Sequence, residues 1–269
     1  MAILSVLLAS PVPAATPDID GIYIDSDNRY RDGTPYDYPW EFEISVDFVN
    51  TGSLNHIDVT KPGGSIPFTT IYEDDGDWEY ESSNYLTLAD LQNDYPTGNH
   101  TLDFRDSSNA LLCSVTLYYP DIDEPLNPVD FTYPSQNGQT GISTTPTFSW
   151  TIDPGDGDAL DLWLEDLDSP NPDEDVYDNW PVSMTTTSWM PGPLLTNRNY
   201  CLGVAVRNVK DIQFINGEPV LPTMTVNDDT FAYSLSMDYL NHIDFTTIPE
   251  PATICLLGLG ALSLVSRKK

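Results

Sequence analysis

Trp40-Glu41-Phe42-Glu43-Ile44-Ser45-Val46-Asp47-Phe48 is the stretch that indicates the fold most directly, because apolar and polar residues alternate along it without a break. Successive side chains on a β-strand point to opposite faces, so the pattern predicts a strand with one buried face and one mostly acidic face. Such strands are typical of an antiparallel sheet that covers a core on one side. The stretch therefore predicts an all-β protein with Trp40 in its core.

The first half of the chain contains further strand patterns and one short helix pattern. Strands are predicted at 66–72, 77–81, 102–104 and 111–119. The step Asp75-Gly76 offers the positive φ of a tight turn, so the first two of these strands are predicted to form a hairpin. A helix is predicted at 87–93, with Thr87 as its N-cap.

Prolines divide the chain near its middle. Pro120, Pro125 and Pro128 punctuate an acidic segment, which predicts a linker at 122–130. Two antiparallel β-sandwich domains are then predicted, at 16–121 and 131–247. Strands of the second domain are expected at 160–164, 176–182, 186–190, 199–208 and 230–236.

The second of these domains carries a spacing of aromatic and apolar residues that is informative. Trp150 lies on an early strand, and Leu194 lies six residues before Tyr200, which opens an alternating strand. In this spacing the domain resembles an Ig-like domain of the fibronectin type III kind. The resemblance implies a buried Trp150 and a Tyr200 hydroxyl that bonds back to the preceding chain. The segment 209–229 departs from it, since a short hairpin is expected there.

The C-terminal segment combines three features in a fixed order. Pro249-Glu250-Pro251 is followed by an apolar stretch at 252–266 and then by Arg267-Lys268-Lys269. As a helix, the 15 apolar residues would be roughly 22 Å long, somewhat less than the ~30 Å hydrocarbon core of a membrane. The basic cluster is expected to stay on the cytoplasmic side and to stop the helix in the membrane.

This tail, at 248–269, resembles the PEP-CTERM sorting signal of bacterial proteins. The resemblance implies export and processing by an exosortase, a membrane protease-transpeptidase. It also implies transient anchoring in the inner membrane by the C-terminal transmembrane helix, followed by release to the cell surface or the extracellular matrix. The alternative interpretation is an ordinary membrane anchor that is never cleaved.

The N-terminus agrees with export. Residues 2–9 are apolar, and small residues follow at Ala14 and Ala15, so a signal peptide is predicted at 1–15. No Lys or Arg precedes Arg29, which indicates either a start codon assigned too late or an unusually bare signal. A first β-strand is the alternative, but Pro11 and Pro13 disfavour it.

The charge of the chain is strongly negative, at −32 with 10 basic and 42 acidic residues. Without the three cations and the one acid of the tail, 7 cations and 41 acids remain, a formal charge of −34. This charge repels nucleic acid, so no nucleic-acid partner is expected. Disorder is rejected for most of the chain, because 40% hydrophobic and 11% aromatic residues suffice for cores.

Two cysteines and two acidic clusters are candidates for a disulfide and for metal binding. Cys113 and Cys201 are interpreted as ordinary strand thiols, with a bridge between domains as the alternative. Two acidic clusters suggest calcium, the one metal ion expected. The residues named for it are Asp153, Asp156 and Asp158 in one cluster, and Asp75, Asp77 and Glu79 in the other. Neither fits an EF-hand, and hairpin turns with solvated acids are the favoured interpretation of both.

Aromatic residues and a repeated segment complete the candidates. Tyr30, Tyr36, Tyr38 and Trp40 could stack on sugars, although Trp40 is expected in the core. The sequence at 54–60 recurs at 240–246 with six identities in seven positions. The two copies are interpreted as equivalent edge strands, one in each sandwich.

Function follows from these patterns only in outline. The sequence has no Gly-x-Ser-x-Gly, no His-Glu-x-x-His and no P-loop, so no enzyme is expected. The prediction is a structural or adhesive protein of the cell surface or extracellular matrix, with extracellular polysaccharide as a partner to consider. The alternatives are a carbohydrate-binding module and, after it, a hydrolase with paired carboxylates.

Overall fold

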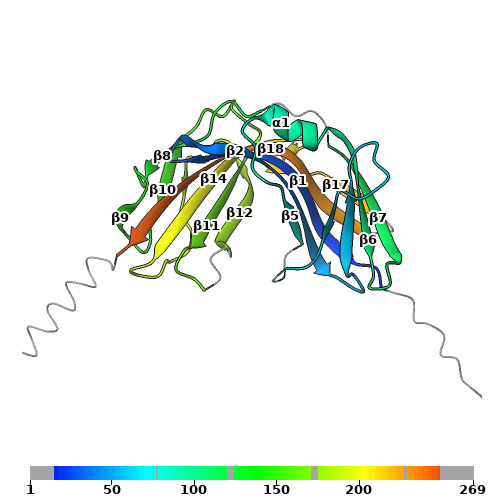
Figure 1. Cartoon of the computed structure of the whole chain (residues 1–269). Helices are drawn as coiled ribbons and strands as arrows, with labels where there is room; N and C mark the ends of the chain where they lie inside the picture. The colour runs from blue at the N-terminus through cyan, green and yellow to red at the C-terminus, as the bar shows by residue number, and fades with distance from the viewer. Residues whose placement is uncertain are drawn as a thin grey trace, which may run out of the picture.

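The chain folds into an arch of two lobes, as the computed structural model in Figure 1 shows. The structure describes residues 15–74, 76, 78–119, 124–170, 175–226 and 229–248. Within these ranges there are eighteen strands and one short helix, so the all-β prediction is confirmed. The segment 1–14 and the tail from Pro249 onward lie outside the described residues.

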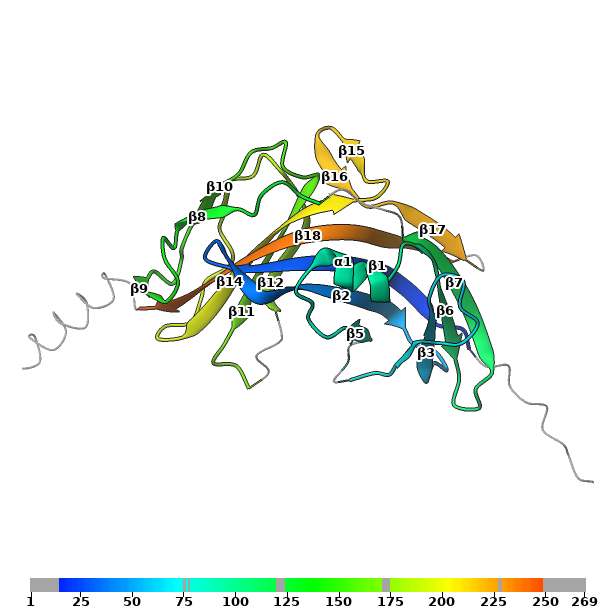
Figure 2. The ribbon, with the colours of Figure 1, turned by 45° about the horizontal axis from the view of Figure 1, so that its top comes forward.

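A large sheet runs through both lobes. Among the described residues it has nine strands, in the order β12-β11-β14-β18-β1-β2-β5, with β17 and β9 also paired to β18. Their bounds are β1 Asp18–Arg31, β2 Thr34–Asn50, β5 Glu79–Glu81, β9 Gln139–Ile142, β11 Ala159–Asp166, β12 Asp175–Ser183, β14 Asn199–Val209, β17 Thr223–Val226 and β18 Asp229–Thr247. Figures 1 and 2 show β1, β2 and β18 passing from one lobe to the other.

Smaller sheets and one helix complete the lobes. One sheet has the order β4-β3-β6-β7 and another the order β13-β10-β8, while β15 and β16 form a separate hairpin. The bounds are β3 His56–Thr60, β4 Thr69–Ile71, β6 Gly98–Arg105, β7 Leu111–Tyr119, β8 Asp130–Tyr133, β10 Phe148–Thr151, β13 Ser188–Trp189, β15 Gln213–Ile215 and β16 Glu218–Val220. The helix α1 spans Leu88–Asp94, and the Thr87 hydroxyl accepts from the Asp90 N–H as predicted.

Two hydrophobic cores lie between the large sheet and the smaller sheets. The first contains Ile22, Ile24, Phe42 and Ile44 from the large sheet, packed against β3, β6 and β7. The second contains Leu162, Val204 and Ile243 from the large sheet, packed against Phe148 and Trp150 of β10. Both sets lie on the same face of the large sheet, because Ile24 opposes Leu235 on β18 and Leu202 opposes Ile243 on the same strand. Leu235 and Ile243 are an even number of residues apart, so their side chains share a face.

The strand β18 joins the two cores. Its first half contributes Phe231, Leu235 and Met237 to the first core, and its second half contributes Ile243 and Phe245 to the second. It pairs in parallel with β1 over eleven residue pairs, from Gly21–Ala232 to Arg31–His242. The prediction of purely antiparallel sheets is therefore wrong here and at the short β18–β9 pairing, which is also parallel. The domain limits at 16–121 and 131–247 stay a prediction.

Several local predictions are corrected by the pairing of strands. Among the described residues, the strands on either side of Gly76 do not pair with each other as a hairpin would, since β4 pairs with β3 and β5 pairs with β2. The positive φ of Gly76 instead serves a turn that crosses between two sheets. The repeated segments are internal strands, not edges: β3 lies between β4 and β6, and β18 lies between β14 and β1.

The predicted linker is held against the large sheet where the structure describes it. Val129 is fully buried, and its carbonyl accepts from Asn241 Nδ2 at 2.8 Å. Glu124 accepts from the Tyr239 hydroxyl at 2.9 Å, and the Leu126 N–H donates to the Asp156 carbonyl at 3.0 Å. The linker limits at 122–130 stay a prediction, and the packing of the described side chains depends on the neighbouring strands.

The corner before β14 has the geometry expected from the resemblance. The Tyr200 hydroxyl accepts from the Leu195 N–H at 2.9 Å, and Tyr200 is 1% exposed. Trp150 is buried as well, and its Nε1 donates to the Thr186 carbonyl at 3.0 Å. Cys113 and Cys201 are buried on β7 and β14 and are not joined by a disulfide, which confirms their interpretation as strand thiols.

Replacing Tyr200 with phenylalanine is expected to lower the free energy of unfolding by about 1–3 kcal/mol, because the Leu195 N–H loses its acceptor. Urea unfolding measures this directly. Tyr118→Phe is the control, since Tyr118 is 63% exposed. An unchanged midpoint for Tyr200→Phe would contradict a structural role for this corner.

Candidate functional site

The polar face of the large sheet carries rows of charged side chains in register. On β1, Ile22 and Ile24 point into the first core, so Asp25 and Asp27 lie on the opposite face. Asp27 lies opposite Asp238 on β18 and opposite Glu41 on β2. Directly opposed residues share a face, with Cβ atoms about 4.5–5.5 Å apart. A row of acids therefore crosses three neighbouring strands.

Arg207 on β14 extends this row and holds three acids. Its Nη1 lies 3.0 Å from Asp238 Oδ2 and 3.3 Å from Asp25 Oδ2, and its Nη2 lies 2.7 Å from Asp161 Oδ2. These side chains are between 0% and 14% exposed. The guanidinium carbon lies 4.7 Å from the centre of the Trp180 ring, which covers it from β12. One buried cation thus faces three buried carboxylates, and the negative charge is in excess.

Hydroxyl groups lie close to these acids, on both faces of the sheet. The Ser236 hydroxyl donates to Asp25 Oδ1 and also lies 3.2 Å from Asp238 Oδ2. On the core-facing side of β1, the Tyr119 hydroxyl from β7 lies 2.8 Å from Ser26 Oγ and 3.0 Å from the Ser236 carbonyl. The two layers of the first lobe are therefore joined by polar contacts at this point.

Burial changes the proton affinity of these acids. Desolvation raises the pKa of Asp27 to about 7 and the pKa of Asp161 to about 6, against the attraction of Arg207. Desolvation also raises the pKa of Asp238 well above its ordinary value, and Arg207 opposes this change too. Burial therefore favours the protonated forms of these acids, and protonation reduces the repulsion between them.

A second acidic group lies beside the row, where β5 pairs with β2. Glu43, Glu79 and Glu81 each place a carboxylate oxygen within 4.8 Å of the other two. Glu43 is half-buried, and the other two are exposed. Arg29 lies 2.6 Å from Glu41 Oε2 and 3.8 Å from Glu81 Oε1, so its closer partner is Glu41. Among the described residues, these three glutamates are the donors best placed to hold a metal ion.

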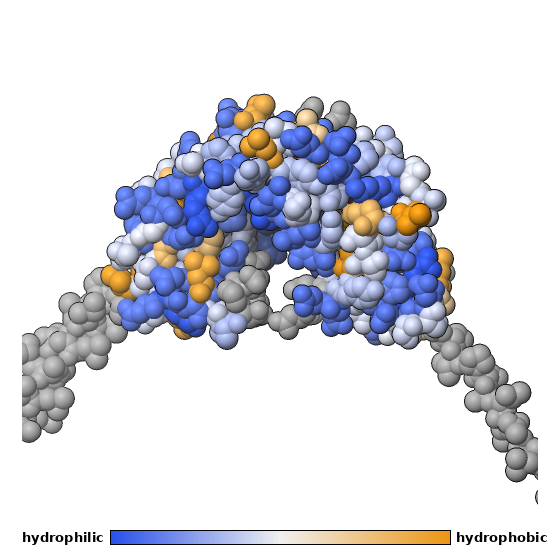
Figure 3. All heavy atoms as spheres, viewed as in Figure 1, coloured by the Kyte–Doolittle hydropathy of each residue, from blue (hydrophilic) through white to orange (hydrophobic). Residues whose placement is uncertain are grey.

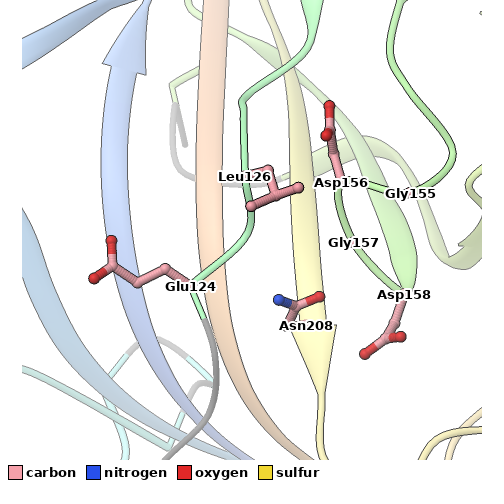
Figure 4. A pocket seen from close by; sticks show the side chains of 7 residues that line it. All are labelled: Glu124, Leu126, Gly155, Asp156, Gly157, Asp158 and Asn208. Carbon is pink, nitrogen blue, oxygen red and sulfur yellow. The ribbon is translucent and has the colours of Figure 1, made fainter.

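Two of the three acids proposed for calcium at 153–158 line a pocket, Asp156 and Asp158, but they do not converge. Figure 4 shows the carboxylates of Asp156 and Asp158 pointing away from each other in a pocket of about 470 Å³. Asp156 lies 3.4 Å from Asn127 Nδ2, and Asp158 accepts from the Val209 N–H at 3.1 Å. Asp153 accepts from the Gly155 N–H at 3.0 Å, within the same turn. Calcium binding at these residues stays a prediction.

Some of the other predicted site residues are described by the structure, and some lie outside the described residues. Asp75 and Asp77 lie outside the described residues, whereas Glu79 joins Glu43 and Glu81 on β5 and β2. The sorting residues also lie outside them, and they are Pro249, Glu250, Pro251, Arg267, Lys268 and Lys269. Among the residues that the structure describes, no helix is long and apolar enough to cross a membrane, and the predicted helix at 252–266 is not one of the described segments.

The predicted aromatic group does not form one platform. Trp40 is 6% exposed and belongs to the first core, while Tyr30 packs on Tyr239 with ring centres 5.6 Å apart. Tyr36 lies beside Arg31, and Tyr38 is 57% exposed. The rings are distributed between the core, the Tyr239 contact and the surface, so they have no common plane on which a sugar could stack.

The histidines of the repeated segment have different surroundings. His56 Nε2 lies 4.0 Å from Asp58 Oδ1, and Arg105 holds the other oxygen of Asp58 at 2.9 Å. His242 is packed edge-on against Trp163, and burial lowers its pKa to about 4. Asp244 pairs with Arg31 at 3.4 Å. The two copies therefore provide no common site.

The row around Arg207 was not identified from the sequence. A signal for it exists, because Asp25 and Asp27 have the same spacing of two as Glu41 and Glu43. The acidic face at 40–48 was interpreted as facing solvent. The parallel pairing of β1 with β18 places Asp238 beside that face, and the pairing of β18 with β14 places Arg207 beside Asp238.

Comparisons with known proteins bear on the tail and the fold. Residues 247–269 match the family model described as the PEP-CTERM protein-sorting motif. No curated protein matches the chain. Similar solved structures include the human OSCAR ligand-binding domain, with 7% identity, 71% of this chain and 92% of that chain covered, and a TM-score of 0.25.

Two further solved structures contain fibronectin type III domains. The chicken CNTN1 FN1-FN3 domains have 12% identity, cover 85% of this chain and 69% of their own, and give a TM-score of 0.23. The fibronectin(III)-like modules of Clostridium thermocellum CbhA have 11% identity, cover 84% of this chain and 94% of their own, and give a TM-score of 0.20.

The tail of this all-β chain therefore implies an exported protein. More specifically, the chain carries a PEP-CTERM sorting motif at 247–269, which implies processing by an exosortase at the membrane and sorting to the cell surface.

Proposed function

We propose that the protein is a structural or adhesive component of the cell surface or the extracellular matrix, and that it acts without catalysis. The observation that carries the proposal is the position of the sorting motif. The motif begins at residue 247, where the central strand β18 ends. The segment that exosortase handles is thus continuous with the strand that joins both hydrophobic cores.

The pairing of β18 suits a load-bearing role. It is hydrogen-bonded to β14 over eleven residue pairs on one side and to β1 over eleven pairs on the other. A force applied at the C-terminal end would act along these strands, and it would load many ladder hydrogen bonds together instead of opening them in turn. The fold therefore transmits tension from an attached tail to both lobes.

The surface composition also fits an extracellular location. Figure 3 shows hydrophilic residues over most of the visible face, with hydrophobic residues in small separate groups. The formal charge of −32 keeps such a protein soluble and repels other anionic polymers. Contact with polysaccharide, if it occurs, would therefore favour neutral chains or ion-bridged anionic ones.

Sorting is tested by the mass of the mature protein. In a host with an exosortase, the protein recovered from the cell surface is expected to lack Arg267, Lys268 and Lys269, because the motif directs removal of the tail. Intact mass spectrometry measures this. A chain that ends at Ile248 is the control and should be absent from the surface fraction. Surface protein that retains the basic cluster would contradict processing.

The structural or adhesive role is tested in the same host. A strain that lacks the protein should attach less or form a weaker matrix, and the full chain should restore this, whereas the chain ending at Ile248 should not. A glycan array with the purified protein separates the carbohydrate-binding alternative. Specific binding to one sugar, with unchanged attachment in the deletion strain, would overturn the proposal.

A further inference from the structure

We propose that Glu43, Glu79 and Glu81 form a binding site for one hard divalent cation, of the calcium type, at the edge of the large sheet. The three residues come from two adjacent strands, β2 and β5. One carboxylate oxygen from each lies within 4.8 Å of the other two. Two ligand oxygens on opposite sides of a calcium ion, at about 2.4 Å each, have a separation of about 4.8 Å. The spacing therefore accommodates such an ion.

The strand register brings the three side chains to one face. Glu43 lies directly opposite Glu81, and Ser45 lies opposite Glu79, so Glu79 is the diagonal neighbour of Glu43. Tyr80, between the two glutamates of β5, points to the other face, where its hydroxyl lies 2.7 Å from that of Tyr95. Like charges directly opposite each other destabilise a sheet, and a bound cation removes that cost.

A buried carboxylate behind the group points independently to a missing ligand. Asp27 is 3% exposed, and its Oδ1 is buried without a hydrogen-bond partner. It lies on the same face, one strand further into the sheet, where it opposes Glu41 on β2 and Asp238 on β18. Buried polar oxygens are almost always satisfied, by protein, water or an ion. Arg29 is the cation beside the group, 3.8 Å from Glu81 Oε1, but its closer partner is Glu41 at 2.6 Å. The negative charge of the three glutamates therefore exceeds what Arg29 balances.

The donor set selects the kind of ion. The group contains carboxylates only, without His or Cys, and such oxygen donors favour calcium, magnesium or manganese over zinc or copper. Three carboxylates can provide up to six oxygens when each binds through both, and calcium takes six to eight in a flexible arrangement. Glu79 and Glu81 are exposed, so an ion can enter from solvent.

The proposal differs from the calcium prediction at 153–158 in a way that can be measured. The purified full chain is treated with EDTA, dialysed, and titrated with calcium while the melting temperature is followed. Calcium should raise the melting temperature progressively above the value in sodium chloride of equal ionic strength, because an ion that binds only the folded state stabilises it. A dissociation constant on the order of 10⁻⁴–10⁻³ M is expected.

Variants locate the site. Glu79→Gln with Glu81→Gln should weaken calcium binding at least tenfold, by isothermal titration calorimetry. The matched control, Asp153→Asn with Asp156→Asn and Asp158→Asn, should bind as the natural chain does. In EDTA the double glutamine variant should be at least as stable as the natural chain, because repulsion is removed; a merely structural role for these glutamates would give the opposite result.

A second readout guards against loss of folding. Terbium bound at the site should show luminescence on excitation of Trp78, which is adjacent to Glu79 in the chain, and calcium should displace it. The single variant Glu81→Gln should lower this signal. Equal shifts in calcium and sodium chloride, or unchanged binding in the double glutamine variant, would overturn the proposal. Loss of binding in the Asp153, Asp156 and Asp158 variant alone would overturn it as well and place the ion in that turn.

Discussion

Replacing Arg207 with methionine is expected to lower the free energy of unfolding by about 3–5 kcal/mol, measured by urea unfolding at neutral pH. Arg207 is the cation nearest to Asp25, Asp161 and Asp238, with distances of 3.3, 2.7 and 3.0 Å. Methionine retains much of the volume but leaves the buried acids without a counter-charge. Removing one partner of a buried ion pair costs more than the pair itself contributes.

Two further variants distinguish this effect from a general loss of surface charge. Lys210→Met should change stability by less than about 0.5 kcal/mol, because Lys210 is 47% exposed and pairs with the exposed Asp211. Adding Asp238→Asn to Arg207→Met should recover part of the loss, since one uncompensated buried charge is removed. A loss below 1 kcal/mol for Arg207→Met would show that the acids are solvated or neutral without it.

Replacing Asp27 with asparagine is expected to stabilise the protein increasingly as the pH rises. Burial raises the pKa of Asp27 from 3.8 to about 7. Between these values the unfolded chain has lost the proton and the folded chain keeps it, so the folded state binds more protons and its stability falls as the pH rises. Asparagine has no proton to lose, and it therefore avoids this fall.

The expected change in unfolding free energy is that of one proton, which the folded chain binds and the unfolded chain does not. The difference in unfolding free energy between Asp27→Asn and the natural chain should grow by about 1.4 kcal/mol per pH unit between pH 5 and 6.5. From pH 4 to pH 8 the total is on the order of 4 kcal/mol. The comparison must be between the variant and the natural chain, because other groups also change stability with pH. Burial lowers the pKa of His100 and of His242 to about 4, so these two histidines make the protein more stable as the pH rises.

The measurement is urea unfolding of both proteins at several pH values, with EDTA present so that no metal contributes. Asp37→Asn controls for the loss of one negative charge, because Asp37 is exposed. That control should differ from the natural chain by a small amount that is nearly independent of pH. A difference for Asp27→Asn that is equally flat would mean that Asp27 is ionised in the folded protein throughout the range.

Local patterns in the sequence were sufficient to predict several secondary-structure elements and the sorting motif. Alternation at 40–48 predicted a strand that lies within β2, and the pattern at 111–119 predicted β7 with its observed bounds. The cap at Thr87 and the spacing of Leu194 and Tyr200 each predicted a hydrogen bond that the structure contains. The sorting tail needs no folded context at all, because its three features are contiguous in the chain.

Which strands pair was decided only by the tertiary structure. Periodicity states that a strand has two faces, but it does not state which distant strand lies beside it. The strand β1 was not predicted, and its pairing with β18 brings residues about 200 positions apart into register, such as Asp27 and Asp238. The same limit explains why a hairpin was expected at Gly76. The two flanking strands, β4 and β5, pair with β3 and β2, which belong to different sheets.

The charged row illustrates the physical reason. Read locally, Glu41 and Glu43 are acids on the polar face of a strand, and solvent is their expected environment. Their neighbours on β1, β18 and β14 bury Glu41 and leave Glu43 half-buried, and they place Arg207 among the buried acids. Burial is a property of the whole assembly of strands, so the sequence determined the strands and their polar faces, and the fold determined what those faces meet.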